Sequence, residues 1–178
     1  MIYLWCMNEF FITKAGPDDL QTIHDMAQVV FRHTYREILS PEQMEYMMDW
    51  MYSPGNLKKQ LEEGHVYYIA HSDGEPCGYL SVQREGVDPE GVEVFHLQKI
   101  YLLPPFQGGG MGRRLFDQAI THVRESKRSP KARIELNVNR SNPAVEFYSH
   151  LGLTILRQGD FHIGNGFYMN DYIMGIDV

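Results

Sequence analysis

A run of glycines stands between a strand pattern and a helix pattern in the middle of the chain. The run, Gln107-Gly-Gly-Gly-Met-Gly112, follows an apolar stretch from Phe95 to Leu103 that Pro104 and Pro105 end, because proline lacks a backbone donor. Glycine lets a backbone approach a ligand closely with its N–H groups pointing outward, and the following helix adds its positive end. The segment therefore predicts a cradle for an anion such as a pyrophosphate.

Two common phosphate-binding motifs do not match this run. A P-loop needs Lys and then Ser or Thr after its last glycine, whereas Arg113 and Arg114 follow Gly112. The dinucleotide pattern GxGxxG fails because no glycine stands at its sixth position. The spacing that is present is Gln-x-x-Gly-x-Gly, formed by Gln107, Gly110 and Gly112. This spacing resembles the acetyl-CoA loop of the GNAT superfamily of N-acetyltransferases.

A second segment, residues 136–153, is similar to the same family. It predicts a strand, a helix with an Asn-x-x-Ala-x-x-Phe-Tyr-like pattern, and a closing glycine, with Asn142, Ala144, Phe147, Tyr148 and Gly152 at the motif places. Ala144 stands one place earlier than is usual in the family. Asn142 is a predicted N-cap with Pro143 at the first helical position, and Gly152 is a predicted C-cap. The two motifs stand in the family's order, and the resemblance covers the chain from about Thr13 onward.

The resemblance implies a fold, a cosubstrate and a set of site residues. The fold would be α/β (α+β layered), with a mixed, mostly antiparallel central sheet flanked by helices and a single domain over residues 1–178. Acetyl-CoA would be the cosubstrate, with Ile100 and Leu102 supplying backbone groups to pantetheine and Asn142 a side-chain contact. Tyr148 would be the general acid, because a phenol with a pKa of ~10 stays protonated at neutral pH. The loop residues expected at the pyrophosphate are Gln107, Gly108, Gly109, Gly110, Met111, Gly112 and Arg113.

The catalytic base is a separate question. Many relatives place a glutamate on the strand before the glycine loop, but Gln98 stands there, and an amide cannot accept a proton. His96 lies on the same strand face by alternation, so it is the predicted base, acting directly or through water. A partly exposed strand histidine without a catalytic role is the alternative. Glu93 is a further candidate.

The acceptor is predicted to be a small primary amine or polyamine. The formal net charge of −7 argues against a nucleic-acid surface and is compatible with a cationic substrate. Glu37, Glu42 and Glu45 are expected near the cleft, and Phe31 and Tyr35 are expected to pack against the alkyl chain of the amine. The segment from Phe31 to Gln43 resembles bacterial polyamine-type acetyltransferases. The alternatives are a protein N-terminal acetyltransferase and a non-catalytic sensor of acetyl-CoA or CoA.

Other classes of site and location have little support in the sequence. The eight histidines are scattered without HExxH or paired Cys/His spacing, so no metal site is expected, and no Gly-x-Ser-x-Gly motif indicates a serine hydrolase. Cys6 and Cys77 are isolated, which favours a reduced, cytoplasmic chain. No apolar run approaches the ~18 residues of a membrane helix. Met1 to Met7 lacks a basic n-region, so no signal peptide is expected; Met7 is an alternative start.

Hydrophobic periodicity predicts the elements that position these residues. The final strand is expected to be an exposed edge through which two molecules associate as a homodimer. The segment from Asp160 to Tyr168 is expected to form a turn beside the cleft, a subunit contact or an ordinary hairpin. Predicted strands are 10–14, 66–70, 77–83, 95–103, 134–138, 154–158 and 167–176, predicted helices begin near Gly16, Ser40, Ser53, Gly112 and Asn142, and 84–91 is a predicted loop.

Overall fold

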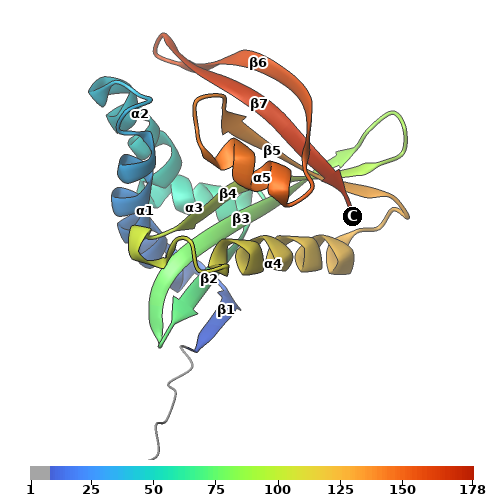
Figure 1. The fold of residues 1–178 in the computed structure, drawn as a ribbon, viewed down its shortest axis with the longest axis horizontal. Helices are drawn as coiled ribbons and strands as arrows, with labels where there is room; N and C mark the ends of the chain where they lie inside the picture. The colour runs from blue at the N-terminus through green and yellow to red at the C-terminus, as the bar shows by residue number, and fades with distance from the viewer. Residues whose placement is uncertain (1–8) are drawn as a thin grey trace, which may run out of the picture.

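The computed structural model describes residues 9–178, so the expectations for Met1 to Met7 and for Cys6 lie outside the described residues. The chain forms a seven-stranded sheet in the order β1-β2-β3-β4-β5-β7-β6 (Figure 1). Every neighbouring pair is antiparallel except β4 and β5, which run parallel. The predicted mixed, mostly antiparallel sheet flanked by helices is confirmed.

The elements follow the chain in an order that begins and ends with strands. The strands are β1 (Phe10–Lys14), β2 (Val66–Ser72), β3 (Glu75–Val87), β4 (Glu93–Leu102), β5 (Ala132–Asn139), β6 (Thr154–Gly164) and β7 (Phe167–Asp177). The α-helices are α1 (Leu20–Tyr35), α2 (Pro41–Tyr52), α3 (Pro54–Glu62), α4 (Met111–Ser126) and α5 (Ala144–His150), with short 3-10 turns at Pro17–Asp19 and Pro104–Phe106.

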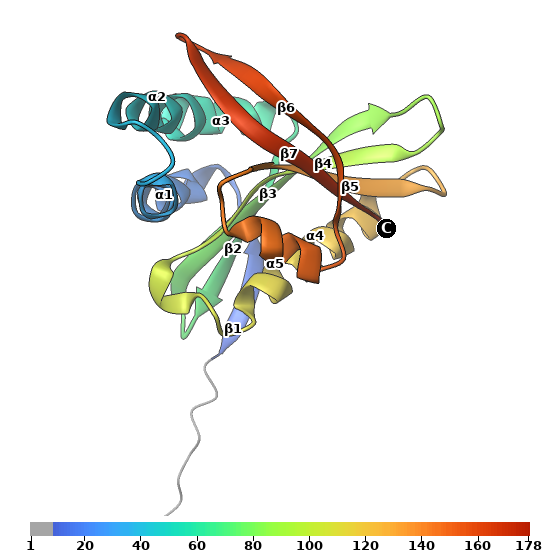
Figure 2. The same cartoon turned by 45° about the horizontal axis from the view of Figure 1, so that its top comes forward.

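Helices cover both faces of the sheet, and each face has its own apolar core (Figures 1 and 2). Strand alternation divides the side chains, so Tyr67 and Ile69 of β2 pack with α1, α2 and α3. Ala70 of β2 and Leu80 of β3 pack on the opposite face, with α4. Met44, Met47 and Met48 of α2 are buried in the first of these cores, and Met51 packs against it partly buried.

The parallel strands β4 and β5 pair over only four positions. The paired segment runs from Glu93 opposite Ala132 to His96 opposite Glu135, and beyond it the strands separate. A β-bulge lies at the start of the separation, because the register between β3 and β4 changes from Ser81 opposite Lys99 to Val82 opposite Leu97. A bulge bends its strand and increases the local twist. The separated part of β4 therefore has no strand partner on its β5 side.

Three sequence-based expectations about strands need correction. The segment 84–91 is not entirely loop, because β3 continues to Val87 and pairs with β4. Strand β6 does not end at the predicted Gln158 but continues to Gly164, and with β7 it forms the ordinary hairpin that was one of the expected alternatives for this segment. The final strand is not an edge: β7 lies between β5 and β6, and β6 is the edge strand.

The tip of the β6–β7 hairpin contacts helix α2. The Tyr46 hydroxyl donates a hydrogen bond to the Ile163 carbonyl at 2.8 Å, and Gln43 Nε2 donates to the Tyr168 carbonyl at 2.8 Å. Helix α2 begins as predicted, with Ser40 Oγ accepting from the Gln43 backbone N–H at 3.1 Å. This contact joins the hairpin, which lies on the β5 side of the gap between β4 and β5, to α2, which packs with β2 and β3 on the β4 side.

Candidate active site

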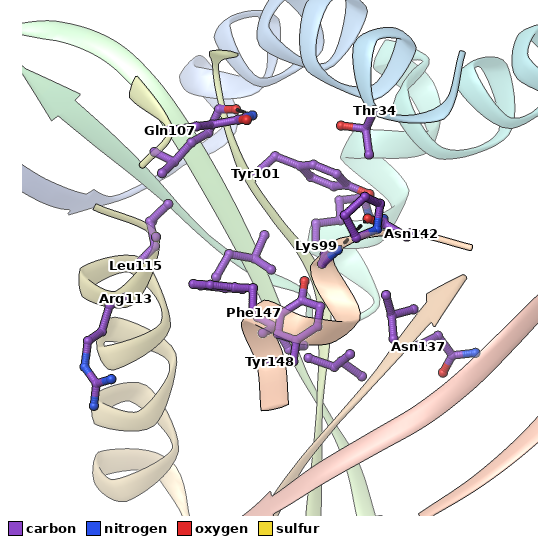
Figure 3. A pocket seen from close by; sticks show the side chains of 18 of the residues that line it. Thr34, Lys99, Tyr101, Gln107, Arg113, Leu115, Asn137, Asn142, Phe147 and Tyr148 are labelled. Carbon is purple, nitrogen blue, oxygen red and sulfur yellow. Dashed lines mark hydrogen bonds between the residues drawn. The ribbon is translucent and has the colours of Figure 1, made fainter. Parts of the chain in front are cut away.

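A cavity of about 680 Å³ lies where β4 and β5 separate. Its walls are β4 from Leu97 to Leu102, β5 from Leu136 to Val138, the glycine loop, the start of α5 and the last turn of α1. Figure 3 shows the labelled side chains around the cavity, which come from these five elements and, for Arg113 and Leu115, from the start of α4. The cavity therefore joins the two segments that carry the sequence motifs.

The glycine loop leaves open space above its backbone. Gly110 precedes α4 with a φ of +78°, a left-handed conformation that favours glycine. A Cβ built on Gly108, Gly109 or Gly110 would meet no atom within 4 Å. Gln107 Nε2 donates to the Leu102 carbonyl at 2.9 Å, which ties the loop to the end of β4. The loop can therefore admit a phosphate group at the N-terminus of a helix.

Most residues predicted at the cofactor line this cavity. They are Ile100, Leu102, Gln107, Gly108, Gly110, Gly112, Arg113 and Asn142. Gly109 and Met111 are not among its lining residues, and Met111 packs partly against the core between the sheet and α4.

Helix α5 brings Asn142 and Tyr148 to the cavity. Asn142 Oδ1 accepts from the Ala144 backbone N–H at 2.9 Å, although the regular helix begins at Ala144, two residues later than the predicted cap. The helix ends at His150 with Leu151 as its C-cap, and Gly152 follows with a φ of +96°, the left-handed conformation common just after a helix. Tyr148 lines the cavity and is buried. Its burial, and to a smaller extent the charge interaction with Tyr35, raises the pKa of its phenol above the ordinary value.

The predicted bases are not at the cavity. His96 does not line it, and its Nδ1 lies 3.4 Å from Glu85 Oε1. Glu93 is buried at the closed end of the β4–β5 pair, where Oε2 accepts from the backbone N–H groups of Arg128 and Ser129 at 2.7 and 2.8 Å. Both residues lie in the segment where β4 is still paired with β5, whereas the cavity begins beyond it.

The residues expected to bind the acceptor are divided. Tyr35 lines the cavity at the end of α1, but Phe31 is buried in the core and does not line it. Glu45 forms an ion pair with Arg32, and Glu37 lies 3.5 Å from Arg36. None of Glu37, Glu42 and Glu45 lines the cavity. All three are exposed, Glu37 in the turn between α1 and α2 and the other two on α2.

The structure adds cavity residues that sequence analysis missed. Lys99 and Tyr101 of β4, Thr34 of α1 and Asn137 of β5 all line it. Beside Asn137, Asp171 of β7 is buried, with Oδ1 lacking a hydrogen-bond partner and Oδ2 accepting from Asn137 Nδ2 at 3.3 Å. Burial raises the pKa of the Asp171 carboxyl. Ile134, Leu136 and Val138 of β5 alternate into the core beside α4, so this alternation indicates that Asn137 points to the other face of the sheet. No pattern in the sequence around Lys99 or Asp171 indicates that either residue belongs to a site.

Metal clusters and membrane-spanning helices are both absent from the part of the chain that the structure describes. Within residues 9–178, no three His, Cys, Asp or Glu side chains gather where they could hold a metal ion, and the absence of a metal stays a prediction. No helix in the same range is long and apolar enough to cross a membrane.

The sheet opens between β4 and β5, and a glycine loop and a buried tyrosine lie at this opening. Together with the two sequence motifs, this arrangement is typical of an acyl-transfer enzyme. A family model for the acetyltransferase (GNAT) domain matches residues 35–169. An uncharacterized N-acetyltransferase from the pepI 3′ region of Lactobacillus delbrueckii subsp. lactis is 30% identical over 161 residues, covering 86% of this chain and 90% of that protein. The chain belongs to the GNAT acetyltransferase family and is an N-acetyltransferase of that family.

Solved structures share the fold. The PaiA N-acetyltransferase from Thermoplasma acidophilum, in complex with coenzyme A, superposes with a TM-score of 0.72 at 22% identity, covering 96% of this chain and 99% of that one. The ribosomal-protein-S18-alanine N-acetyltransferase from Escherichia coli gives a TM-score of 0.68 at 17% identity, covering 96% and 94%. At these identities the likeness concerns the fold.

Proposed function

We propose that this protein transfers the acetyl group of acetyl-CoA directly to a primary amine of a small molecule, such as a polyamine. The observation that carries the proposal is one cavity that joins an open anion cradle at Gly108–Gly110 to the buried hydroxyl of Tyr148. Acetyl-CoA supplies the acetyl group as an activated thioester. Two proteins of similar fold support acetyl-CoA as the acetyl donor, since one was solved with coenzyme A and another, from Salmonella typhimurium, with acetyl-CoA.

The chain's residues divide the work of binding. The loop N–H groups and the N-terminus of α4 bind the pyrophosphate, with Arg113 adding positive charge at its edge. The unpaired side of β4 near Ile100 and Leu102 offers backbone groups to pantetheine, since no strand occupies that side beyond His96. A backbone N–H there also polarises the thioester carbonyl.

Tyr148 supplies the proton for the departing sulfur. Its raised pKa keeps the phenol protonated across the physiological range, which an acid needs before the carbon–sulfur bond breaks. The amine approaches from the side of α1, where Tyr35 lines the cavity. Asp171 does not itself line the cavity, but it is buried beside the lining residue Asn137 with its Oδ1 unpartnered, and a carboxylate there favours a cationic acceptor.

A panel of acceptors tests the proposal. We expect CoA release with spermidine or a diamine that exceeds release with N-terminal peptides. A Michaelis constant that rises with salt would follow from a charged acceptor. Peptide turnover without amine turnover would contradict the small-amine acceptor and favour acetylation of protein N-termini. CoA binding with no turnover of any acceptor would favour a sensor.

We also propose that two molecules associate as a homodimer through strand β6. This strand is the edge of the sheet and exposes Ile155, Leu156 and Phe161. An unpaired edge with apolar side chains offers a template for a second chain. Sedimentation at micromolar concentration should give a dimer, and a monomer there would contradict this part of the proposal.

A further inference from the structure

Lys99 is a buried lysine in the wall of the cavity. Its residue is 6% exposed, and its Nζ donates a hydrogen bond to Gln60 Oε1 at 2.8 Å. Gln60 is held in that orientation, because its Nε2 donates to the Met51 carbonyl at 2.9 Å and its Oε1 also accepts from the Tyr67 hydroxyl at 2.5 Å. The partner of Lys99 is therefore a fixed, uncharged amide oxygen.

No carboxylate balances this lysine. Among residues 9–178, no Asp or Glu oxygen lies within 4 Å of its Nζ. The titratable groups that face it are the ring of Tyr52 from α2, the ring of Tyr67 from β2, and His65, which precedes β2. The two ring centroids lie 5.7 and 5.5 Å from Nζ. Burial lowers the pKa of Lys99 to about 7, so a large neutral fraction exists at physiological pH.

The position of Lys99 suits an exchange of protons with an acceptor. Lys99 and Tyr101 alternate on the β4 face that packs against α1, α2 and α3, opposite Ser81 and Tyr79 of β3. Figure 3 shows Lys99 and Tyr148 among the side chains of the same cavity. His96 lies outside that cavity, and Gln98 cannot accept a proton. Two basic side chains that can accept one line the cavity: His33 is exposed, with its Nδ1 3.3 Å from Arg36 Nη1, whereas Lys99 is buried.

We propose that neutral Lys99 accepts the proton that the acceptor's ammonium group must lose before it attacks the thioester. This inference rests on the proposed function. Lys99 Nζ takes the first proton, and the freed amine nitrogen bonds to the acetyl carbon as the carbon–sulfur bond breaks. Tyr148 gives its proton to the sulfur, and the second proton of the amine restores Tyr148. Lys99 then releases its proton to solvent, so one proton leaves per turnover.

The test compares Lys99→Met and Lys99→Arg with Lys131→Met, an exposed lysine remote from the cavity. With a diamine at about pH 7, we expect kcat/KM of both Lys99 variants to fall on the order of 10²-fold, while acetyl-CoA affinity and the rate of Lys131→Met stay unchanged. The deficit of Lys99→Met should shrink toward about pH 10, where solvent has already deprotonated the acceptor. A purely structural role would leave the deficit independent of pH.

A second measurement does not depend on turnover. Nitrogen NMR of lysine-labelled wild type should show Nζ of Lys99 losing its charge near pH 7. The Lys99 signal is assigned as the one that is absent from Lys99→Met or Lys99→Arg. Matching pH–rate profiles of wild type and Lys99→Met, or a Lys99 that stays charged at about pH 9, would overturn the inference. A wild type that turns over no amine would instead contradict the proposed function, and the NMR titration would still decide the state of Lys99.

Discussion

The hydroxyl groups of Tyr35 and Tyr101 lie 3.4 Å apart and connect the end of α1 to β4. Both rings pack against Phe31 in the core, so this contact fixes the acceptor side of the cavity relative to the strand beside the cofactor. Tyr35→Phe should raise KM for the amine about fivefold, the equivalent of about 1 kcal/mol for one polar contact, with little change in kcat. Steady-state kinetics measures both constants. An unchanged KM would show that the contact does not position the acceptor.

Gly110→Glu should weaken acetyl-CoA binding at least tenfold, about 1.4 kcal/mol, because it places a carboxylate where the phosphate is expected. Calorimetry measures the affinity. Gly91→Glu is the matched control. Gly91 also has a left-handed φ, of +82°, and a Cβ added there would have no atom within 4 Å, but Gly91 lies in the turn between β3 and β4, away from the loop. Equal acetyl-CoA affinities in the two folded variants would contradict the prediction that the glycine loop binds the pyrophosphate.

Tyr148→Phe should keep the packing of α5 and remove the acid. We expect kcat to fall on the order of 10²-fold with little change in acetyl-CoA affinity, if proton transfer to sulfur limits the rate. Tyr168→Phe, at a tyrosine that is 53% exposed, should behave as wild type. Full activity in Tyr148→Phe would assign the proton to water or to another group.

Glu93 should make the fold sensitive to acid. Burial alone would raise the pKa of its carboxyl, but Arg84 and the backbone N–H groups of Ser129 and Arg128 outweigh burial and lower the pKa to about 2. Because the folded pKa lies below the unfolded value of about 4.3, the stabilisation is present above that value and is lost as pH falls toward 2. Denaturant unfolding between these pH values should show a smaller pH dependence for Glu93→Gln than for wild type.

The parts of the site that sequence predicted are those that local chemistry determines. The glycine loop and the Asn142–Tyr148 helix are continuous segments whose caps and turn residues are visible in the chain, and both line the cavity. The strands and helices were likewise predicted from their periodicity. The bounds of several strands were wrong, most of all for β3, which ends at Val87 and not Gln83, and β6, which ends at Gly164 and not Gln158.

The rest depends on contacts between distant segments. Lys99 is buried because Gln60, Tyr52 and Tyr67 come from three other elements, and no neighbour in sequence indicates this. His96 misses the cavity because β4 and β5 are still paired there. The place of β7 inside the sheet also escaped prediction, since the order of strands in space does not follow their order in the chain.

That strand order has a consequence for biosynthesis. β7 is the last of the seven strands to leave the ribosome, yet it is the antiparallel partner of both β5 and β6. Until β7 emerges, a nascent chain can assemble β1 to β4 and pack α1 to α4 on them, while the outer edge of β5 stays unpaired. Asn137 of the cavity wall therefore gains its β7 partners, and Asp171 beside it, last, so a chain that stops before β7 lacks this support of the acceptor side.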